Sequence, residues 1–436
     1  MRGQLACRHS SRLYEVARQN LGTIGGAEEL MKTDVLVLID HGVQLVTFIA
    51  SLGGIAYYLM AGAAARRLRK KREQDATVKA SFPPLSLLKP VGGVHSGLED
   101  HLESFFRQDY PLFEILFAVE KQSDPAVAVV EKLVARHPHV PTRLIITGES
   151  PYSNAKVFSM EKMATLARHE TLVITDDDTS VGPGYLKAVA HSIASTRVGA
   201  VTHLYRGIAG SDFWSKLEAL GMSTEFMAGV VVAERLEGMK FTLGPSMVIR
   251  ADCLQAIGGF AVLAEYLADD FVLGGRLVQA GYPVLLSAHI VNHHASSTGF
   301  VNSLKHRLRW NRSSRFSRPA GYLGQGFTYG LPWALLFYVM VRNPWGLGVL
   351  LCALVARAWL AFELGTKLLE DRTILRRLGL IPLQDLLSFV TWVGGFLAAQ
   401  VSDDHPGLLF CDVVWRHLVP GTPLVMIRKM RSSLLP

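Results

Sequence analysis

Cysteine and charge are both scarce in this chain of 436 residues. Its four cysteines, Cys7, Cys253, Cys352 and Cys411, are too scattered for a disulfide framework or for a zinc site built on paired cysteines. We therefore expect the folded domain in a reducing compartment. Charged residues make up 19% of the chain and hydrophobic residues 49%, which excludes disordered and fibrous proteins. Two classes of protein remain: a large enzyme with a very apolar core, or a domain attached to membrane helices.

Several motifs of common enzyme classes are missing. The sequence has no GxxxxGK[ST] loop, no GxGxxG after its first expected strand, no HExxH and no GxSxG. Their absence argues against ATPases of the P-loop type, dehydrogenases, metalloproteases and serine hydrolases. A nucleic-acid module with interleaved aromatic and basic residues is missing too. We therefore expect no nucleic-acid partner, although the net charge is +8.

Long apolar runs predict membrane helices at both ends of the chain. Residues 42–65 are uncharged, and at about 1.5 Å per residue they can cross a hydrocarbon layer of about 30 Å. The basic residues 66–72 follow at once. By the positive-inside rule we expect an integral protein of the inner (cytoplasmic) membrane, with its catalytic domain facing the cytoplasm. The first thirty residues lack the apolar core of a signal peptide, and Met31 is a candidate start.

Three further apolar stretches lie near the C-terminus, at about residues 325–341, 345–362 and 381–399. Buried core helices are the alternative, but the clustering of these stretches and their tryptophans favour the membrane. Arg357 lies within one stretch, where a charge costs roughly 2.5 to 3.5 kcal/mol, and Asp385 is its candidate partner. If all four apolar stretches crossed the membrane, the basic C-terminal tail would lie on the side opposite the cytoplasm, which conflicts with the positive-inside rule. The alternative is that the stretch around Asp385 is interfacial or re-entrant.

Between residues 83 and 303, short apolar runs alternate with helical periodicities. This rhythm predicts an α/β fold with a Rossmann-like, mostly parallel sheet and helices on both faces. Ligands of such sheets bind at the carboxyl ends of the strands. The expected strands are residues 84–91, 113–120, 143–147, 171–175 and 199–202, and the expected helices are residues 98–106, 126–136, 156–168 and 185–196.

Acidic residues follow two of these strands. Asp124 comes shortly after the second, and the triplet Asp176, Asp177 and Asp178 directly follows the fourth. Adjacent carboxylates repel one another unless a cation compensates, and Mg²⁺ or Mn²⁺ binds one or two carboxylates together with substrate phosphates. We therefore expect Asp176 and Asp178 to hold Mg²⁺ or Mn²⁺ against a diphosphate. The alternative is an acidic turn in which Asp178 caps the next segment.

Two later segments carry further candidates. Asp269 and Asp270 begin an expected helix, where they either meet its positive dipole end or supply a general base to an acceptor hydroxyl. Arg309 and Trp310 lie in a basic segment that is either a headgroup anchor or a site where Arg309 binds a diphosphate. Four apolar residues either line a lipid entry or belong to the core: Met222, Phe226, Met227 and Met247.

Together these segments resemble the ceramide glucosyltransferase family and, more broadly, the inverting membrane glycosyltransferases with a GT-A-type fold. The resemblance runs through SLLKPVGG, SFFRQDYPLFEILFAV, SDPAVAVVEKL and LVITDDDTSV to LADDFVLGGRL and HRLRW, over about half of the chain. Three departures stand out. His306 occupies the first position of the family's (Q/R)xxRW motif, and residues 152–156 and the tail after Gln400 lack the expected patterns.

The resemblance implies roles for the matched residues. Asp124 corresponds to the acid that binds the uracil and ribose side of the sugar nucleotide. Asp176 and Asp178 correspond to the pair that binds metal and diphosphate, and Asp270 to the general base. The other matched residues would contact substrates. Arg309 and Trp310 would bind the diphosphate and the acceptor, and Lys89, Lys156 and Asp269 would lie near the donor.

The expected function is inverting transfer of a hexose, in the first place glucose, from a UDP-sugar to the hydroxyl of a membrane lipid such as ceramide. A hopanoid or a polyprenyl phosphate is the alternative acceptor, and a catalytically silent protein that binds UDP-sugar or lipid is the alternative class. The expected organisation is an N-terminal segment (1–41), a membrane helix (42–65), a basic linker (66–82), the catalytic domain (83–303), a basic interfacial segment (304–324), membrane helices (325–400) and a tail (401–436).

Overall fold

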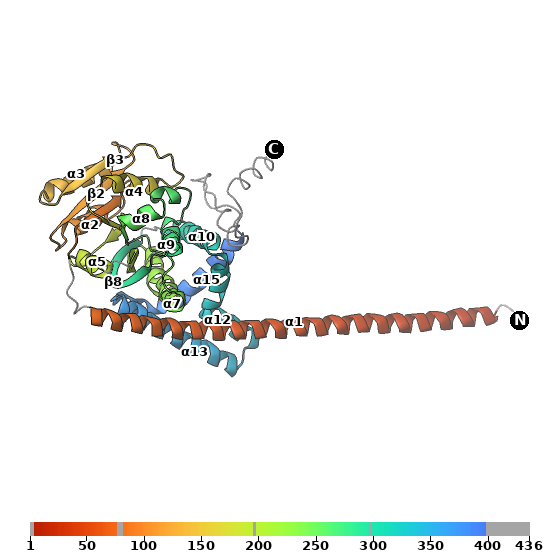
Figure 1. Ribbon diagram of the computed structural model, residues 1–436. Coiled ribbons are helices and arrows are strands. Elements are labelled where there is room, and N and C mark those ends of the chain that lie inside the picture. Colours follow the sequence, from red (N-terminus) through yellow and green to blue (C-terminus); the bar gives the residue numbers. More distant parts are fainter. Residues whose placement is uncertain (1–3, 76–81, 195–197, 296–298, 398–436) are drawn as a thin grey trace.

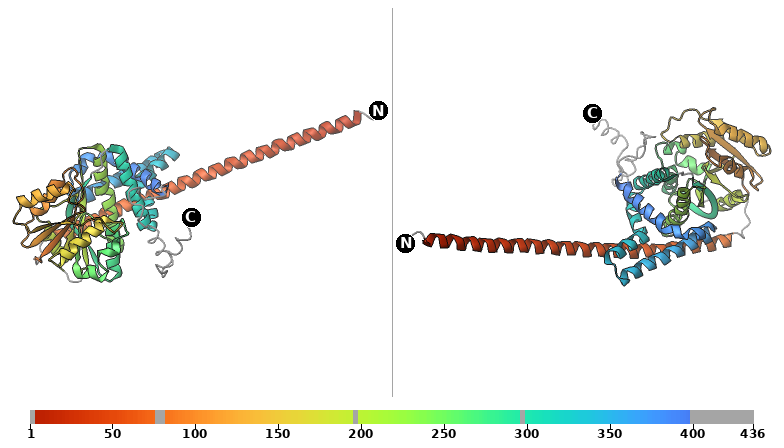
Figure 2. Two further views of the ribbon diagram at one scale, coloured as in Figure 1. Left: turned by 90° about the horizontal axis from the view of Figure 1, so that it is seen from above. Right: turned by 180° about the vertical axis from the view of Figure 1, so that it is seen from behind.

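The computed structural model describes residues 4–75, 82–194, 198–295 and 299–397, with side chains of the first helix described from Leu38 on. An α/β domain packs beside a group of apolar helices, and helix α1 (Gln4–Asp75) runs past both (Figures 1 and 2). The expected tail, 401–436, and residues 76–81 of the expected linker lie outside the described residues.

A mixed sheet forms the centre of the α/β domain. Over the described residues it has eight strands in the order β3-β2-β1-β4-β7-β6-β8-β5. Strands β1 to β4 pair in parallel, as does β6 with β8, whereas β7 runs antiparallel to β4 and β6, and β5 runs antiparallel to β8. Their bounds are β1 (Leu85–Pro90), β2 (Phe113–Val119), β3 (Thr142–Ile146), β4 (Thr171–Ile174), β5 (Thr179–Ser180), β6 (Ala200–Ala209), β7 (Met247–Arg250) and β8 (Val284–Ala295).

The parallel half of the sheet agrees with the sequence pattern. All residues of β2 are buried, as expected for a parallel strand covered on both faces. Strands β5, β7 and β8 are additions that the pattern did not predict. They include every antiparallel pair, so the sheet is more mixed than the expected mostly parallel one.

The order of the strands also determines where the helices lie. The chain steps from β1 to β2 to β3 toward one edge, and then returns past β1 to β4. Right-handed connections therefore place α2 and α3 on one face and α4 on the other, with a switch point between β1 and β4. The helical segments of this domain are α2 (Leu98–Phe106), α3 (Ala126–Arg136), α4 (Ala155–Leu166), α5 (Tyr185–Ile193), α6 (Phe213–Gly221), the π-helical turn η1 (Met222–Phe226), α7 (Met227–Glu237), α8 (Ala251–Ala256), η2 (Phe260–Leu263) and α9 (Asp269–Gln279).

Three described helical stretches are long and apolar enough to cross a membrane: Leu38–Glu73, Pro344–Leu368 and Thr373–Phe396. The crossing expected at 325–341 is instead the 12-residue helix Gly330–Val341, which at about 18 Å is shorter than the hydrocarbon layer. The segments after the α/β domain are α10 (Gly299–Ser317), α11 (Pro319–Gln325), η3 (Gly326–Thr328), α12 (Gly330–Val341), α13 (Pro344–Leu360), η4 (Ala361–Leu368), α14 (Thr373–Arg377), η5 (Leu378–Leu380) and α15 (Ile381–Leu397).

Helix α15 packs along the basic helix α10. Arg307 donates to the Gln384 side chain at 2.8 Å, and Arg315 donates to the carbonyl of Gly395 at 2.8 Å. A helix that packs against two arginines of a neighbouring helix is poorly suited to the hydrocarbon core. These contacts favour the interfacial alternative for this segment.

Helix α1 joins the two parts of the protein. It meets α12 at a backbone contact, because a Cβ on Gly54 would lie 2.1 Å from the Cα of Gly330, a close approach typical of small residues in membrane helices. The basic residues 66–72 continue this helix to Asp75 rather than forming a linker. Uninterrupted helical hydrogen bonding across the charged segment explains the difference, since Arg and Lys are good helix formers.

Candidate functional site

Four of the nine predicted site residues lie at or just after strands around the switch point of the sheet. Lys89 is the penultimate residue of β1, Asp124 follows β2, and the triplet beginning at Asp176 follows β4. Because β1 pairs in parallel with both β2 and β4, these residues lie at one edge of the sheet. The prediction of polar residues at the carboxyl edge is confirmed.

One lysine links the β4 loop to α9. The Nζ of Lys156 lies 2.7 Å from Oδ1 of Asp176 and 3.4 Å from Oδ2 of Asp269. Burial alone would lower the pKa of Lys156, but the two carboxylates hold that pKa above its usual value. The same pairing holds the pKa of Asp176 below its usual value despite burial. Lys156 is therefore the counter-ion of this acid cluster.

The N-terminus of α4 positions that lysine. Asn154 caps the helix by accepting a hydrogen bond from Val157 N at 3.3 Å, and its amide donates to the carbonyl of Tyr266 at 2.8 Å. The cap thus connects the first turn of α4, which contains Lys156, to the loop that precedes Asp269.

Asp270 is held by backbone amides. Gly244 N donates to its Oδ2 at 2.8 Å, and Phe271 N donates to its Oδ1 at 2.7 Å. Burial and the neighbouring Asp269 carboxylate raise the pKa of Asp270 to about 6, against the lowering effect of Lys156 and of these two amides. A fixed carboxylate with a pKa near neutrality is suited to general-base chemistry.

Gly244 brings two of the acids to the same place. A Cβ at this position would lie 2.8 Å from Oδ2 of Asp176 and 3.4 Å from Oδ2 of Asp270. Both carboxylates therefore face one glycine, although they come from different parts of the chain. Only a residue without a side chain leaves this space open.

Asp178 lies beside a histidine and a buried tyrosine. Its Oδ1 is 3.4 Å from Nδ1 of His293, and His293 lies 5.2 Å from Tyr205 between ring centroids. Burial, followed by the negative charges of Asp270, Asp178 and Asp176, raises the pKa of Tyr205 well above its usual value. Three of the predicted acids, Asp176, Asp178 and Asp270, therefore lie close enough to Tyr205 to raise its pKa.

The acids fit a divalent cation in part. Among the described residues, no group of three or more His, Cys, Asp or Glu side chains is arranged to hold a metal. However, Oδ1 of Asp178 is buried and makes no hydrogen bond, and Mg²⁺ or Mn²⁺ needs only one or two carboxylates when a diphosphate supplies other oxygens. Asp176 and Asp178 therefore suit a cation that binds together with a donor.

Lys89 supports the site from inside the domain. Its side chain is fully buried, and its Nζ donates to the backbone carbonyl of Asp176 at 2.6 Å and lies 4.1 Å from the Phe105 ring. Burial lowers the pKa of Lys89 to about 8, although the neighbouring acids oppose this shift. Enclosed in this way, Lys89 supports the backbone of the β4 loop, and its role near the donor stays a prediction.

Asp124 organises the loop after β1. Its Oδ1 accepts hydrogen bonds from Gly93 N at 3.0 Å and Ala126 N at 2.8 Å. The same loop contains His95, whose Nε2 lies 3.8 Å from Oδ1 of Asp177. Asp124 is therefore connected to the acidic triplet through this loop and not by direct contact.

Helix α10 carries the RW pair outside the acid cluster. Trp310 lies 6.2 Å from Phe226, and Phe226 lies 5.8 Å from Tyr205, between ring centroids. A row of aromatic rings thus leads from α10 to the acids. Arg309 is exposed, and within the described chain no carboxylate pairs with it. The structure does not bring Arg309 into contact with the acids.

The motif departure at His306 has a local counterpart. Nδ1 of His306 lies 2.6 Å from Oε1 of Glu218, and its ring lies 4.7 Å from Trp310. Among the four residues considered for a lipid entry, only Phe226 is exposed, at 42%. The other three are core residues: Met222, Met227 and Met247.

Sequence reasoning missed Tyr205, His293 and Gly244. The first two lie on β6 and β8, which pair with each other, and nothing in the local pattern distinguishes them from ordinary strand residues. Asn154 carried a detectable signal, since asparagine before a helical run is a typical N-cap.

Comparisons with known proteins agree with the motif pattern. The family model of glycosyl transferase family 21 matches residues 46–402. Ceramide glucosyltransferase 1 of Caenorhabditis elegans is 27% identical over 245 residues, 56% of this chain and 52% of that protein. Ceramide glucosyltransferase 3 of the same organism is 24% identical over 304 residues, 70% of this chain and 64% of that protein. The chain thus spans about half to two thirds of the length of these relatives.

A solved structure with a similar outline is a mannosyltransferase from Pyrobaculum calidifontis in complex with GDP-Man and Mn²⁺. It is 18% identical, with a TM-score of 0.42, and the match covers 79% of this chain and 99% of that one. The family match, which extends from α1 to the end of the described chain, confirms both the resemblance found in the motifs and the GT-A-type fold class with membrane helices. The chain belongs to glycosyl transferase family 21.

Proposed function

We propose that this protein is an inverting glycosyltransferase that moves a hexose, in the first place glucose, from a UDP-sugar to the hydroxyl of a membrane lipid such as ceramide. The observation that carries the proposal is the environment of Asp270. Its carboxylate is fixed by two backbone amides, has a pKa raised to about 6, and shares Gly244 with Asp176. A base of this kind, beside a counter-ion cluster, suits proton removal from an alcohol.

The chemical step requires one base and one leaving group. Asp270 takes the proton of the acceptor hydroxyl, and the oxygen forms a bond to the anomeric carbon. The bond from that carbon to the diphosphate breaks on the opposite face, so UDP departs with the electron pair and the configuration inverts. No covalent intermediate with the protein is needed.

Donor binding falls to the residues around the switch point. Asp124 and its loop would receive the uridine side, and Asp176 and Asp178 would hold Mg²⁺ or Mn²⁺, which supplies positive charge to the departing diphosphate when bound. Lys156 pairs with Asp176 and Asp269 and holds both side chains in place. The exposed Arg309 is the candidate for a further contact with the diphosphate.

The acceptor lipid reaches the acids along the row of aromatic rings between α10 and β6. Trp310, Phe226 and Tyr205 connect the basic helix α10 with the acids, and amphipathic aromatic residues suit the boundary between lipid and water. The basic residues after the apolar part of α1 support an orientation with the catalytic domain on the cytoplasmic side of the inner membrane.

A transfer assay tests the proposal directly. Membranes containing the protein are incubated with radiolabelled UDP-glucose, UDP-N-acetylglucosamine or UDP-galactose, and the extracted lipids are identified. We expect label from UDP-glucose in a ceramide-type lipid. Label in a hopanoid or polyprenyl lipid would change the acceptor, and bound nucleotide without UDP release from any lipid would point to a catalytically silent binding protein.

A further inference from the structure

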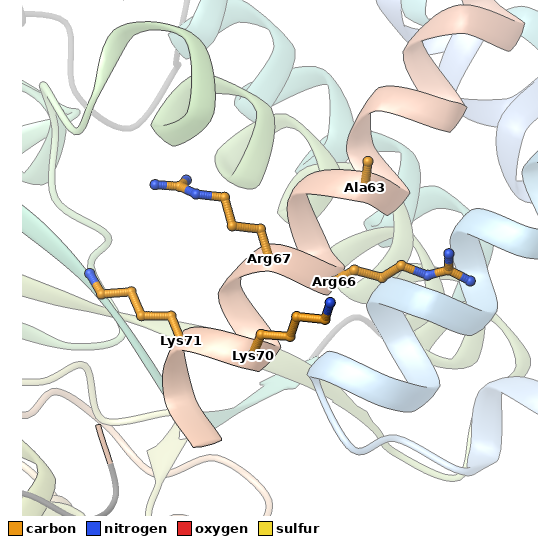
Figure 3. Close-up of a pocket in the computed structure, with 5 residues that line it drawn as sticks. All are labelled: Ala63, Arg66, Arg67, Lys70 and Lys71. Atoms are coloured by element: carbon orange, nitrogen blue, oxygen red, sulfur yellow. The ribbon is translucent and has the colours of Figure 1, made fainter. Parts of the chain in front are cut away.

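A basic groove lies where α1 leaves the apolar helices. Ala63, Arg66, Arg67, Lys70 and Lys71 line a shallow hollow of about 500 Å³ (Figure 3). Their spacing of three and four residues places them on adjoining faces of the helix. Figure 3 shows Arg66 and Lys70 extending to one side of α1, and Arg67 and Lys71 to the other.

Only half of the positive charge in the groove is neutralised. Arg66 pairs with Glu363 of η4 at 2.9 Å, and Arg67 pairs with Glu234 of α7 at 3.0 Å. Lys70 and Lys71 are exposed, and no carboxylate of the described chain pairs with either of them. The groove therefore keeps two positive charges for a ligand.

The position of the groove favours a lipid headgroup. It follows the apolar part of a helical stretch that can cross a membrane. The guanidinium of Arg66 lies 5.0 Å from the ring of Trp359, and tryptophan is enriched at the level of the headgroups. Lysines at this level are attracted to anionic phospholipids.

We propose that the basic groove binds the phosphate group of an anionic phospholipid. This inference goes beyond the transferase activity. The groove also lies between the two parts of the protein, because Arg66 pairs with Glu363 of the apolar helices and Arg67 pairs with Glu234 of the α/β domain. Anionic phospholipid bound at Lys70 or Lys71 would hold the α/β domain against the bilayer, where the proposed acceptor lipid reaches Asp270.

The test uses the full-length protein in nanodiscs of phosphatidylcholine, with or without phosphatidylglycerol. Native mass spectrometry counts retained phosphatidylglycerol, and lipid glycosylation is measured in parallel. We expect phosphatidylglycerol to be retained and to lower the KM for the acceptor. The double variant Lys70→Gln, Lys71→Gln should retain phosphatidylglycerol about 30-fold less well. It should also lose the effect on KM, while UDP-sugar binding is unchanged.

A matched control separates the groove from general charge. Lys132 on α3 and Lys162 on α4 are exposed lysines of the α/β domain, and the variant Lys132→Gln, Lys162→Gln should behave as the unmodified protein. Equal lipid retention in both double variants would overturn the proposal. Equal stimulation by soluble glycerol phosphate at matched ionic strength would also overturn it, because the ligand would then be a free phosphate.

Since the lipid count does not depend on catalysis, its outcome is independent of the proposed transferase activity. If the protein glycosylates no lipid but retains less phosphatidylglycerol after substitution of Lys70 and Lys71, the result still supports lipid binding at the groove.

Discussion

The guanidinium of Arg357 donates two hydrogen bonds to the carboxylate of Asp385, from Nε to Oδ2 and from one terminal nitrogen to Oδ1, each 2.8 Å long. Arg357 is only 2% exposed, and it also donates to Thr224 Oγ1 at 3.1 Å. One arginine on α13 thus connects α15 and the π-helical turn η1. The sequence named Asp385 as the candidate partner, and the structure confirms this pairing.

Removing one partner of that pair should destabilise the protein. We expect Asp385→Ala to cost about 3 to 5 kcal/mol, because it leaves a buried guanidinium without its counter-ion. Thermal unfolding in detergent is the measurement. The double variant Arg357→Met, Asp385→Leu should recover most of the loss, and Asp252→Ala, which breaks an exposed pair with Arg250, should cost less than about 1 kcal/mol. Equal costs for Asp385→Ala and Asp252→Ala would contradict the buried pair.

Asp270→Asn should separate donor binding from turnover. The variant lacks a base, so we expect turnover to fall by about 100-fold or more, while UDP-sugar binding, measured by calorimetry, is retained. Asp109→Asn is the control, because Asp109 is an exposed carboxylate paired with Lys187. Normal turnover of Asp270→Asn would remove this residue from the mechanism.

The pH profile should report the environment of Asp270. Its ionised form accepts the proton, and its pKa is raised to about 6, so kcat/KM should fall about tenfold per unit below pH 6. Lys156 lowers that pKa. We therefore expect Lys156→Met to move the acidic limb to higher pH, and Lys156→Arg to move it much less. An acidic limb that stays in place in Lys156→Met would show that another group titrates.

Gly244→Ala should disturb the acids without unfolding the domain. The new Cβ would lie 2.8 Å from Oδ2 of Asp176, so that carboxylate must move, and misplacement by about 1 Å can cost roughly 100-fold in rate. Gly275→Ala is the matched control, because its nearest neighbour would be 3.7 Å away. If the two variants have comparable activity and similar thermal stability, the carboxylates of Asp176 and Asp270 do not both lie against Gly244.

Chelation should stop the reaction. Asp178 Oδ1 is buried without a hydrogen bond, and a carboxylate in this state suits a cation ligand. We expect EDTA to abolish transfer, Mg²⁺ or Mn²⁺ to restore it, and Asp178→Asn to need more metal for the same rate. A rate that EDTA leaves unchanged would mean that the acidic triplet holds no required metal.

Local patterns predicted about half of the fold correctly. Helices α2 and α3 begin and end at the expected residues, since their apolar positions repeat with the helical period and bury one face. The acids after β2 and β4 could be placed at one edge of the sheet because parallel strands end on the same side. Strands β7 and β8 were missed, because β7 has only four residues and β8 contains a run of four half-buried residues, 287–290, that interrupts the alternation of buried positions.

The sequence alone determined the segments of this protein: apolar helices, a βα alternation, and acids at strand ends, all of which depend on neighbouring residues. The tertiary structure decided which of these residues act together. The pairing of Lys156 with Asp176 and Asp269, the shared glycine at position 244, and the position of Tyr205 beside His293 each join segments far apart in the chain. Such contacts arise from the order of the strands and the packing of side chains, which no local pattern contains.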